Sequence, residues 1–492
     1  MIDKQVVNKD ILERTIQRAR ENNIIIPTYE EMKNPEKVPE KIKKELSSIG
    51  LWDLHPRNLF RITWKNEQKR FGGGFDGVNY LELPTELTGV NARIFILLGK
   101  FFPTGAHKVG ATFGPLVEKL VRGAFDPTKQ KALWPSTGNY CRGGAYDSHL
   151  LSCQAIAVLP EGMSKERFQW LKSIGAEIYA TPGVESNVKE VFDKTKELKA
   201  SYPEEIVVLN QFEDFGNPTW HYAVTGPAME EIFTKESRES DKLSALFLTQ
   251  GSAGTLGSGN YLRKKFPKIK IGAGEALQCP TMLYNGFGGH RIEGIGDKHI
   301  PWIMDVKNLD MAIAIDDESA MHIIRLFNEE AGRNYLKKVL KGNEIIDKLD
   351  IFGISSIANI LGAIKMAKYY EFTEHDFIFT VSTDSMELYQ SRILELRDQY
   401  GEYTEMDASR DFERYILGTT NDWMLEMNYY DKKRIHNLKY FTWIEQQGKT
   451  LEELNSQWYD DYYFLNKFES YREWDELIKD FNKEVGLIRN YR

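Results

Sequence analysis

The pattern of apolar and polar residues changes near Leu81, where short apolar runs begin to alternate with stretches of helical periodicity. The runs predicted as strands are residues 92–98, 154–159, 177–181, 206–209, 245–249, 269–275 and 377–381. The stretches predicted as helices are residues 111–123, 164–175 and 187–200. This alternation is typical of an α/β fold, in which helices cover a parallel sheet and ligands bind where its strands end. The sequence therefore predicts an α/β protein with a ligand site at these turns.

Two regions outside this alternation are predicted to be extensions. Residues 1–74 begin with a charged helix over about 9–22 and continue as a proline-containing loop. Residues 396–492 are rich in aromatic side chains and are predicted to be helical. Aromatic clusters of this kind usually belong to a core or an interface rather than to a ligand cage. Residues 75–395 are left as the predicted central domain.

Composition and charge exclude several classes of protein. The 492 residues are 41% hydrophobic and 28% charged, as in globular proteins that bury a large core. A net charge of −8 without a concentrated basic stripe argues against nucleic acid and membranes as partners. Three cysteines without paired spacing indicate neither a disulfide framework nor a zinc site, so no metal is expected. The charged N-terminus and the lack of about 18 consecutive apolar residues indicate a cytoplasmic protein.

Two motifs at predicted strand-to-helix turns carry candidate chemistry. Residues 103–112 read PTGAHKVGAT, where a lysine at the base of a helix can be desolvated, as a nucleophilic amine requires. Residues 249–261 read TQGSAGTLGSGNY, where glycines let backbone N–H groups converge on a phosphate at a helix N-terminus. Most lysines are surface residues, and a glycine-rich turn can also serve close packing. Each motif alone therefore leaves a structural explanation open.

Two further turns carry hydroxyl and amide side chains. Residues 135–146 read PSTGNYCRGGAY, which suits a carboxylate or a ring oxygen as ligand. Residues 381–389 read VSTDSMELY and place hydroxyls at the end of a strand. Helix capping explains both turns equally well when each is taken in isolation.

Taken together and in this order, the four motifs resemble the cysteine synthase-like branch of the fold-type II pyridoxal phosphate enzymes, with tryptophan synthase β as a cousin. Other segments that resemble this family are residues 159–183, 210–232, 288–301 and 353–367. The resemblance covers about residues 75–395. It implies a catalytic core of two subdomains, each with a parallel sheet and helices on both faces. The smaller subdomain, about residues 110–225, would be inserted in the larger one.

The resemblance also implies roles for individual residues. Lys108 stands where the family forms its Schiff base with pyridoxal 5'-phosphate, and the freed amine would then remove the substrate's Cα proton. The other cofactor contacts that it implies are His107, Asn139, Gly251, Ser252, Ala253, Gly254, Thr255 and Ser385. The substrate contacts that it implies are Ser136, Thr137, Gly138, Tyr140 and Gln211.

Ser385 determines which chemistry the resemblance predicts. It matches the family's serine that faces the pyridine nitrogen, and a hydroxyl cannot keep that nitrogen protonated as a carboxylate would. The weaker electron sink favours loss of a leaving group from the β-carbon, which gives an aminoacrylate. If the carboxylate of Asp384 faced the nitrogen instead, a stronger electron sink and different chemistry would follow.

The substrate turn departs from the family pattern. Cysteine synthases have Asn-Thr-Gly where this chain has Asn139, Tyr140, Cys141 and Arg142 in succession. Arg142 is a candidate either to recognise an anionic side chain or to form a surface salt bridge. Cys141 is either a reactive thiol or an inert small residue. These departures leave the identity of the amino-acid substrate open and do not affect the cofactor prediction.

Three functions are compatible with these residues. The resemblance favours β-replacement on a small β-substituted amino acid, carried out by a homodimer. The second function is that of a β-elimination lyase or ammonia-lyase that releases pyruvate. The third is a non-catalytic subunit of the same fold, against which the intact Lys108, Asn139 and glycine-rich turn argue.

Overall fold

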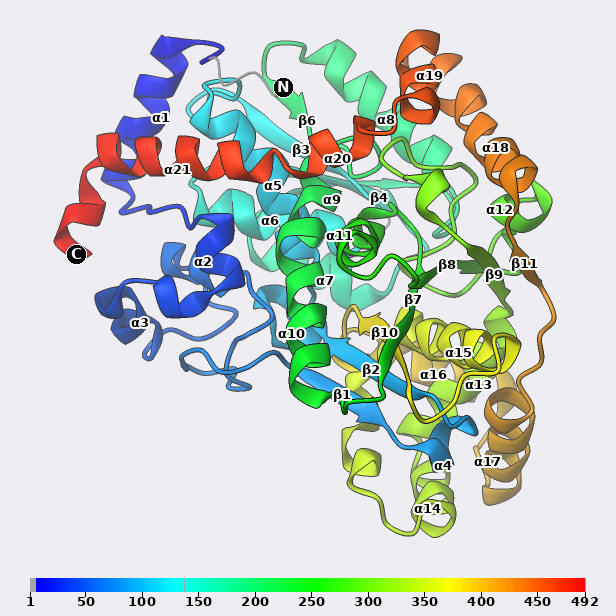
Figure 1. Ribbon diagram of the computed structural model, residues 1–492. Helices are drawn as coiled ribbons and strands as arrows, with labels where there is room; N and C mark the ends of the chain where they lie inside the picture. Colours follow the sequence, from blue (N-terminus) through cyan, green and yellow to red (C-terminus); the bar gives the residue numbers. More distant parts are fainter. Residues whose placement is uncertain (1–5, 137, 492) are drawn as a thin grey trace.

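Two sheets organise the protein in the computed structural model, which describes residues 6–136 and 138–491 (Figure 1). The larger sheet consists, in spatial order, of β1 (Tyr80–Leu83), β2 (Arg93–Leu98), β10 (Asp376–Ser382), β7 (Lys242–Thr249), β8 (Lys270–Ala276), β9 (Met311–Ile315) and β11 (Met424–Glu426). Its central strands are parallel, while β1 and β11 pair antiparallel at the two edges.

The smaller sheet is parallel throughout. Its strands, in spatial order, are β5 (Glu177–Thr181), β4 (Gln154–Pro160), β3 (Lys131–Pro135) and β6 (Ile206–Val208). The helices that connect these strands are α6 (Asn139–Leu150), α7 (Lys165–Ser173) and α8 (Val188–Ser201). The two parallel-stranded sheets confirm the predicted α/β class, and the subdomain boundaries stay a prediction.

Alternating side chains of β7 enter two different hydrophobic cores. Leu246 and Leu248 pack into one core, whereas Ala245 and Phe247 pack into the other. Because successive residues of a strand point to opposite faces, this alternation requires helices on both sides of the sheet. Helix α11 (Gly257–Lys265) supplies Leu262 to the first core, and α15 (Ile354–Tyr369) covers the second.

The N-terminal region contains more helix than was predicted. Helix α1 (Lys9–Glu21) confirms the first element, but the predicted loop also contains α2 (Tyr29–Lys33) and α3 (Glu40–Leu46). The sequence signal for α2 is a capping box. The hydroxyl of Thr28 accepts from the backbone N–H of Glu31, whose carboxylate accepts from the backbone N–H of Thr28.

The C-terminal extension is mostly helical, as predicted, and consists of α17 (Glu405–Asp411), α18 (Tyr429–Asn437), α19 (Leu451–Tyr459), α20 (Tyr463–Phe468) and α21 (Tyr471–Val485). The prediction missed β11, which pairs with β9. A strand of three residues has too short an apolar pattern to be recognised without its partner. Trp443 and Phe468 are buried, so these aromatic residues belong to the core.

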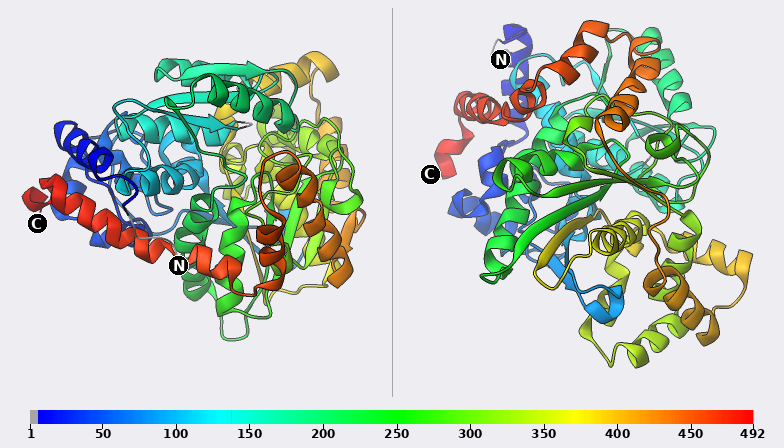
Figure 2. Two further views of the ribbon diagram at one scale, coloured as in Figure 1. Left: turned by 90° about the horizontal axis from the view of Figure 1, so that it is seen from above. Right: turned by 45° about the vertical axis from the view of Figure 1, so that its right-hand side comes forward.

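Helix α21 crosses back over the molecule to the N-terminal segment (Figures 1 and 2). Asn482 exchanges hydrogen bonds of 3.0 and 2.7 Å with the backbone N–H and C=O of Ile26. The carboxylate of Asp475 accepts from the backbone N–H groups of Tyr29 and Glu30, at the start of α2. The first and last segments of the described chain therefore stabilise each other.

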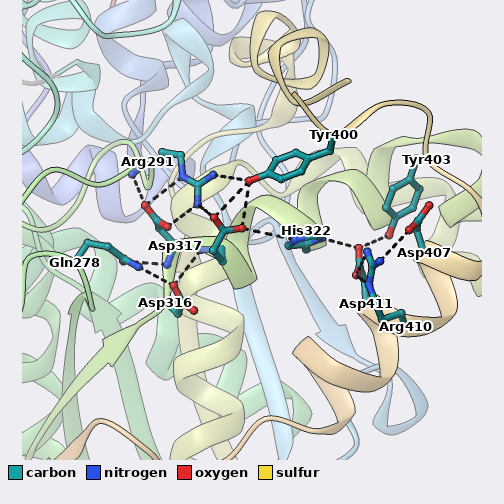
Figure 3. Close-up of polar contacts among 11 residues, drawn as sticks. Gln278, Arg291, Asp316, Asp317, His322, Tyr400, Tyr403, Asp407, Arg410 and Asp411 are labelled. Atoms are coloured by element: carbon teal, nitrogen blue, oxygen red, sulfur yellow. Dashed lines mark hydrogen bonds and ion pairs between the residues drawn. The ribbon is translucent and has the colours of Figure 1, made fainter. Parts of the chain in front are cut away.

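A chain of polar contacts fixes α17 against α13 (Asp317–Asn328) (Figure 3). The Nδ1 atom of His322 on α13 lies 3.0 Å from a carboxylate oxygen of Asp411, which also accepts from the Tyr403 hydroxyl at 2.9 Å. At the other end, Arg291 donates to the Asp317 carboxylate at 2.7 Å. These contacts attach the C-terminal extension to the larger sheet's helical layer.

The remaining helices connect the strands of the larger sheet or lie between the two sheets. They are α4 (Thr85–Thr88), α5 (Lys108–Val121), α9 (Gly216–Trp220), α10 (Gly226–Glu236), α12 (Thr281–Tyr284), α14 (Glu330–Val339) and α16 (Gln390–Tyr400). Helix α5 begins at Lys108 rather than at the predicted Ala111. None of the helices in the described part of the chain combines the length and apolar character needed to cross a membrane.

Candidate functional site

A cavity lies where the turns of both sheets converge. Most of the predicted cofactor and substrate residues line it, namely His107, Lys108, Ser136, Asn139, Tyr140, Gln211, Gly251, Ser252, Ala253, Gly254 and Thr255. The turns that follow β3, β7 and β10 each contribute to this lining. Gly138 and Ser385 are not lining residues, and Thr137 lies outside the described residues.

Lys108 is the first residue of α5 and lines the cavity with its half-buried side chain. Its Nζ atom donates to the hydroxyl of Ser252, a residue of the glycine-rich turn, at 3.2 Å. Burial lowers the pKa of Lys108 to about 8, against the opposing effect of the carboxylates of Asp297 and Glu185. A larger fraction of this amine is therefore neutral near pH 7 than for an exposed lysine, as a nucleophile requires.

His107 is a neutral support rather than a base. Burial, followed by the neighbouring charge of Lys108, lowers the pKa of His107 to about 3. Its Nε2 atom lies 3.3 Å from the hydroxyl of Thr383, and its ring packs edge-on against His221. An imidazole with this pKa stays uncharged at neutral pH, so it can position neighbours but cannot accept a proton there.

The glycine-rich turn between β7 and α11 presents free donors. The backbone N–H groups of Gly251, Ser252 and Ala253 donate to no described group. Ala253 has a left-handed backbone conformation, with φ of 63°, which turns the chain sharply before α11. A Cβ atom at Gly254 would collide with the side-chain amide of Asn217, so glycine is required there for close packing. Free N–H groups before a helix N-terminus form a site for an anion such as phosphate.

Asn139, the first residue of α6, is hydrogen-bonded to a buried carboxylate. Its Nδ2 atom donates to Asp384 Oδ2 at 2.5 Å, and the Tyr389 hydroxyl donates to the same oxygen at 2.6 Å. The Oδ1 atom of Asn139 is buried and has no partner among the described residues. The amide orientation is therefore set by Asp384, from outside the cavity lining.

The turn after β10 places Thr383, rather than Ser385 or Asp384, in the cavity lining. Asp384 is directed toward Asn139 and Tyr389, and burial raises the pKa of its carboxyl. Ser385 is buried outside the lining. The predicted contact of Ser385 with the pyridine nitrogen stays a prediction, with Thr383 as the hydroxyl that the geometry favours.

Alanine substitutions at these two positions distinguish the hydroxyls. We expect Thr383→Ala to weaken cofactor binding about fivefold, since a hydrogen bond contributes roughly 1 kcal/mol. We expect Ser385→Ala to change this affinity less than twofold, which corresponds to a binding free energy difference of about 0.4 kcal/mol or less. The measurement is a fluorescence titration of each cofactor-free variant with pyridoxal phosphate. A larger loss for Ser385→Ala would restore the original assignment.

The described residues of the substrate turn form hydrogen bonds and ring contacts. The Ser136 hydroxyl accepts from the backbone N–H of Gly138 at 2.9 Å. The Tyr140 ring packs edge-on against Trp134, and its hydroxyl has no partner among the described residues. Gln211 also lines the cavity. These groups offer polar donors and acceptors to a small ligand.

Cys141 and Arg142 do not line the cavity, which corrects part of the sequence interpretation. Burial raises the pKa of the Cys141 thiol to about 12, and the thiol donates to the carbonyl of Gly138. Arg142 is neither a surface residue nor a cavity residue, since it is buried with its guanidinium 4.7 Å from the Trp170 ring. Both side chains are therefore buried outside the cavity lining.

The sequence interpretation missed several lining residues, namely Phe212, Thr249, Gly294, Ile295, Asp297 and Thr383. Asp297 is the most consequential, because burial raises the pKa of its carboxyl to about 7, against the lowering effect of Lys108. A signal was present, since Asp297 directly follows Gly294, Ile295 and Gly296 in a segment that resembles the family. The fold was needed to place this carboxyl near Lys108.

Comparisons with known proteins agree with this geometry. A family model described as "Pyridoxal-phosphate dependent enzyme" matches residues 77–334. A cysteine synthase from Staphylococcus aureus (strain Mu50 / ATCC 700699) is 31% identical over 301 residues, which cover 61% of this chain and 88% of that protein. A probable cysteine synthase from Bacillus subtilis (strain 168) is 31% identical over 246 residues, which cover 49% of this chain and 76% of that protein.

Solved structures show the same architecture. The O-acetylserine-dependent cystathionine beta-synthase from Helicobacter pylori has a TM-score of 0.52 and 26% identity. That match covers 63% of this chain and 94% of the other. A cysteine synthase from Entamoeba histolytica has a TM-score of 0.56 at 22% identity, covering 68% of this chain and 92% of the other, which supports the fold alone.

Proposed function

Since the chain belongs to the family of pyridoxal-phosphate dependent enzymes, we propose that it catalyses β-replacement on a small β-substituted amino acid. Its cofactor is pyridoxal 5'-phosphate. The similarity to proteins named cysteine synthase and O-acetylserine-dependent cystathionine beta-synthase supports a serine derivative as the substrate class. The observation that carries the proposal is the position of Lys108, which faces the glycine-rich turn in one cavity.

The described residues fit the phosphate of this cofactor. The free N–H groups of Gly251, Ser252 and Ala253 point to an anion site, and α11 adds the positive end of its dipole. Asn217 donates to the Ser252 hydroxyl at 3.0 Å, which holds the turn in place. We assign this turn to the phosphate and Lys108 to the covalent attachment of the cofactor.

The chemistry divides between the cofactor and the protein. Bound pyridoxal phosphate supplies an electron sink for bonds at the substrate's Cα atom. Lys108 Nζ, with its lowered pKa, accepts the Cα proton and later returns it. Asn139 and His107, which both line the cavity, would help to hold the cofactor, and neither has to ionise to do so.

The residues near the turn after β10 support a reaction at the substrate's β-carbon. Thr383 presents a hydroxyl in the cavity, whereas the carboxylate of Asp384 is engaged by Asn139 and Tyr389 outside the lining. A hydroxyl partner would not keep the cofactor's ring nitrogen protonated, so the cofactor would be a weaker electron sink, which favours departure of a β-substituent. Ser136, Tyr140 and Gln211 are the proposed contacts of the substrate carboxylate.

The visible spectrum of the purified protein tests the proposed function. We expect a yellow protein whose absorption band shifts when O-acetylserine or another β-substituted amino acid is added. Alanine, which has no β leaving group, is the matched control and is expected not to produce the same spectral form. A colourless protein, or a cofactor band that no β-substituted amino acid changes, would refute the proposal.

The assembly and compartment are proposed from the family resemblance. We propose a homodimer that acts in the cytoplasm. Sedimentation of the holoenzyme should give twice the chain mass of 56.9 kDa. A species of single-chain mass at the concentration used for assays would contradict the dimer.

A further inference from the structure

Among the described residues that line the cavity, Asp297 is the one with an acidic side chain. It shares this lining with Lys108, the glycine-rich turn and Gln211. The carboxylate and the Lys108 amine are close enough to influence each other's pKa, but they form no ion pair within 4.0 Å among the described contacts. The cavity therefore contains a second group that can exchange a proton, separate from the nucleophilic amine.

The Oδ2 atom of Asp297 has no hydrogen-bond partner among the described residues, although it is buried. Asp384 and Asp305 also have one buried oxygen without a partner, but the other oxygen of Asp384 accepts from Asn139 and Tyr389, and that of Asp305 accepts from Asn260 at 2.7 Å. The described contacts of Asp297 include no hydrogen bond to either carboxylate oxygen. A buried carboxyl without a partner is destabilising unless another group forms a hydrogen bond with it. Its position in the lining points to a ligand as that group.

The backbone around Asp297 is held firmly. Its carbonyl accepts from the Thr281 hydroxyl at 2.8 Å. The preceding Gly296 donates to the carbonyl of Gln250 and accepts from His290, each at 2.8 Å. Gly296 has a φ of 74°, which a side chain would rarely adopt. A functional group fixed in this way is preorganised for one task in the cavity.

Replacement at the β-carbon requires two separate proton transfers. Lys108 transfers the Cα proton. The incoming nucleophile also carries a proton, which must leave as the nucleophile forms its bond to the β-carbon. Building on the proposed function, we propose that Asp297 accepts this proton. In that step the H–X bond breaks, its electron pair forms the X–Cβ bond, and the proton moves to the carboxylate oxygen. The carboxylic acid then returns the proton to solvent before the next turnover.

The electrostatics of the cavity agree with this role. Burial raises the pKa of Asp297 to about 7, where a carboxyl can both accept and donate a proton at neutral pH. Lys108 opposes this rise while the amine is charged. Lys108 carries the Cα proton while the nucleophile adds, so its charge then favours the carboxylate form of Asp297, which is the form that can accept a proton. The nucleophiles that benefit are those protonated at pH 7, namely thiols and water.

The test compares a protonated nucleophile with one that is already an anion. Holoenzyme and the Asp297→Asn holoenzyme are first mixed with O-acetylserine and then with 2-mercaptoethanol or azide. We expect the substitution to slow decay of the new spectral form about 100-fold with the thiol, as loss of a general base does, and less than about fivefold with azide. Asp305→Asn, which makes the same change at an acid that does not line the cavity, is the control and should leave both rates unchanged.

A second readout needs no turnover. Infrared difference spectra of the cofactor-free protein between pH 5 and pH 9 should contain carbonyl bands of protonated carboxylic acids, because burial raises the pKa of Asp297 and of Asp475 to about 7. We expect Asp297→Asn to lose one component of this signal and Asp305→Asn to keep that component.

The outcomes separate the two proposals. If the unsubstituted enzyme shows no spectral change with O-acetylserine, the proposed function fails. If that change occurs and Asp297→Asn reacts with the thiol at the unsubstituted rate, the role of Asp297 alone is refuted. Equal losses with thiol and azide also overturn the role, because they indicate a structural effect on the cavity.

Discussion

Lys108→Ala is expected to abolish β-replacement, with kcat lowered by at least about 10³-fold. Loss of a general base alone costs roughly 10²–10⁴-fold, and this variant also loses the covalent attachment of the cofactor. The side chain is half-buried at the start of α5 and contacts the Ser252 hydroxyl, so truncation removes its amine from the cavity and leaves the surrounding turns. The measurement is steady-state turnover of O-acetylserine with a thiol, together with mass spectrometry after borohydride reduction.

Lys119→Ala is the matched control for this prediction. Lys119 lies on the same helix but pairs with Asp214 at 3.1 Å, away from the cavity. Its loss is expected to change kcat less than about twofold, as is usual for a charge outside the site. Borohydride reduction should leave the cofactor mass on Lys108 in this control. If the Lys108→Ala variant carried the reduced cofactor on another residue, the assignment of Lys108 would be wrong.

Arg167→Met is expected to lower the free energy of unfolding by roughly 3 kcal/mol, the lower end of the cost of breaking a buried ion pair. Arg167 is fully buried and pairs with Glu293 at 2.9 Å while donating to the Tyr389 hydroxyl at 2.8 Å. Its removal would leave the charge of Glu293 without one of its two arginine partners. Arg392, the other partner, still donates to this carboxylate at 2.7 Å. The measurement is urea unfolding of the cofactor-free protein.

The same substitution should also change the position of side chains in the cavity. Tyr389 connects Arg167 to Asp384, whose carboxylate orients Asn139 in the lining. We therefore expect weaker cofactor binding in addition to the loss of stability. Lys165→Met, on the exposed side of the same helix, is the control and should change neither quantity. Equal unfolding energies for the two variants would contradict the importance of the buried pair.

Within the smaller sheet, the sequence predicted β4, β5, β6, α7 and α8 well because each has a clear period, but it gave no bounds for β3 and α6. Strand β5 matches its predicted bounds, and β4 differs only at its last residue. The antiparallel β11 was not predicted, since three residues next to an aromatic helical region show no alternation. Helix α2 was missed although Thr28 and Glu31 form a recognisable capping pair. Both β11 and α2 are short elements whose stability comes from tertiary partners.

The candidate site could be predicted only as far as its motifs are local. Lys108 and the glycine-rich turn are each continuous in sequence, and the structure brings both to one cavity. The turn after β10 shows the limit, because its sequence offers Thr383, Asp384 and Ser385 and does not reveal which one faces the ligand. Asp297 shows the same limit, since its raised pKa results from burial that only the folded chain provides.

The most direct test of the central claim is to identify the product formed from O-acetylserine and 2-mercaptoethanol by mass spectrometry. The account predicts a new thioether amino acid, formed in equal amount to the acetate released, with no accumulation of pyruvate. It also predicts that Lys108→Ala forms none of this product. Pyruvate in place of the thioether would contradict replacement at the β-carbon and would establish elimination as the reaction.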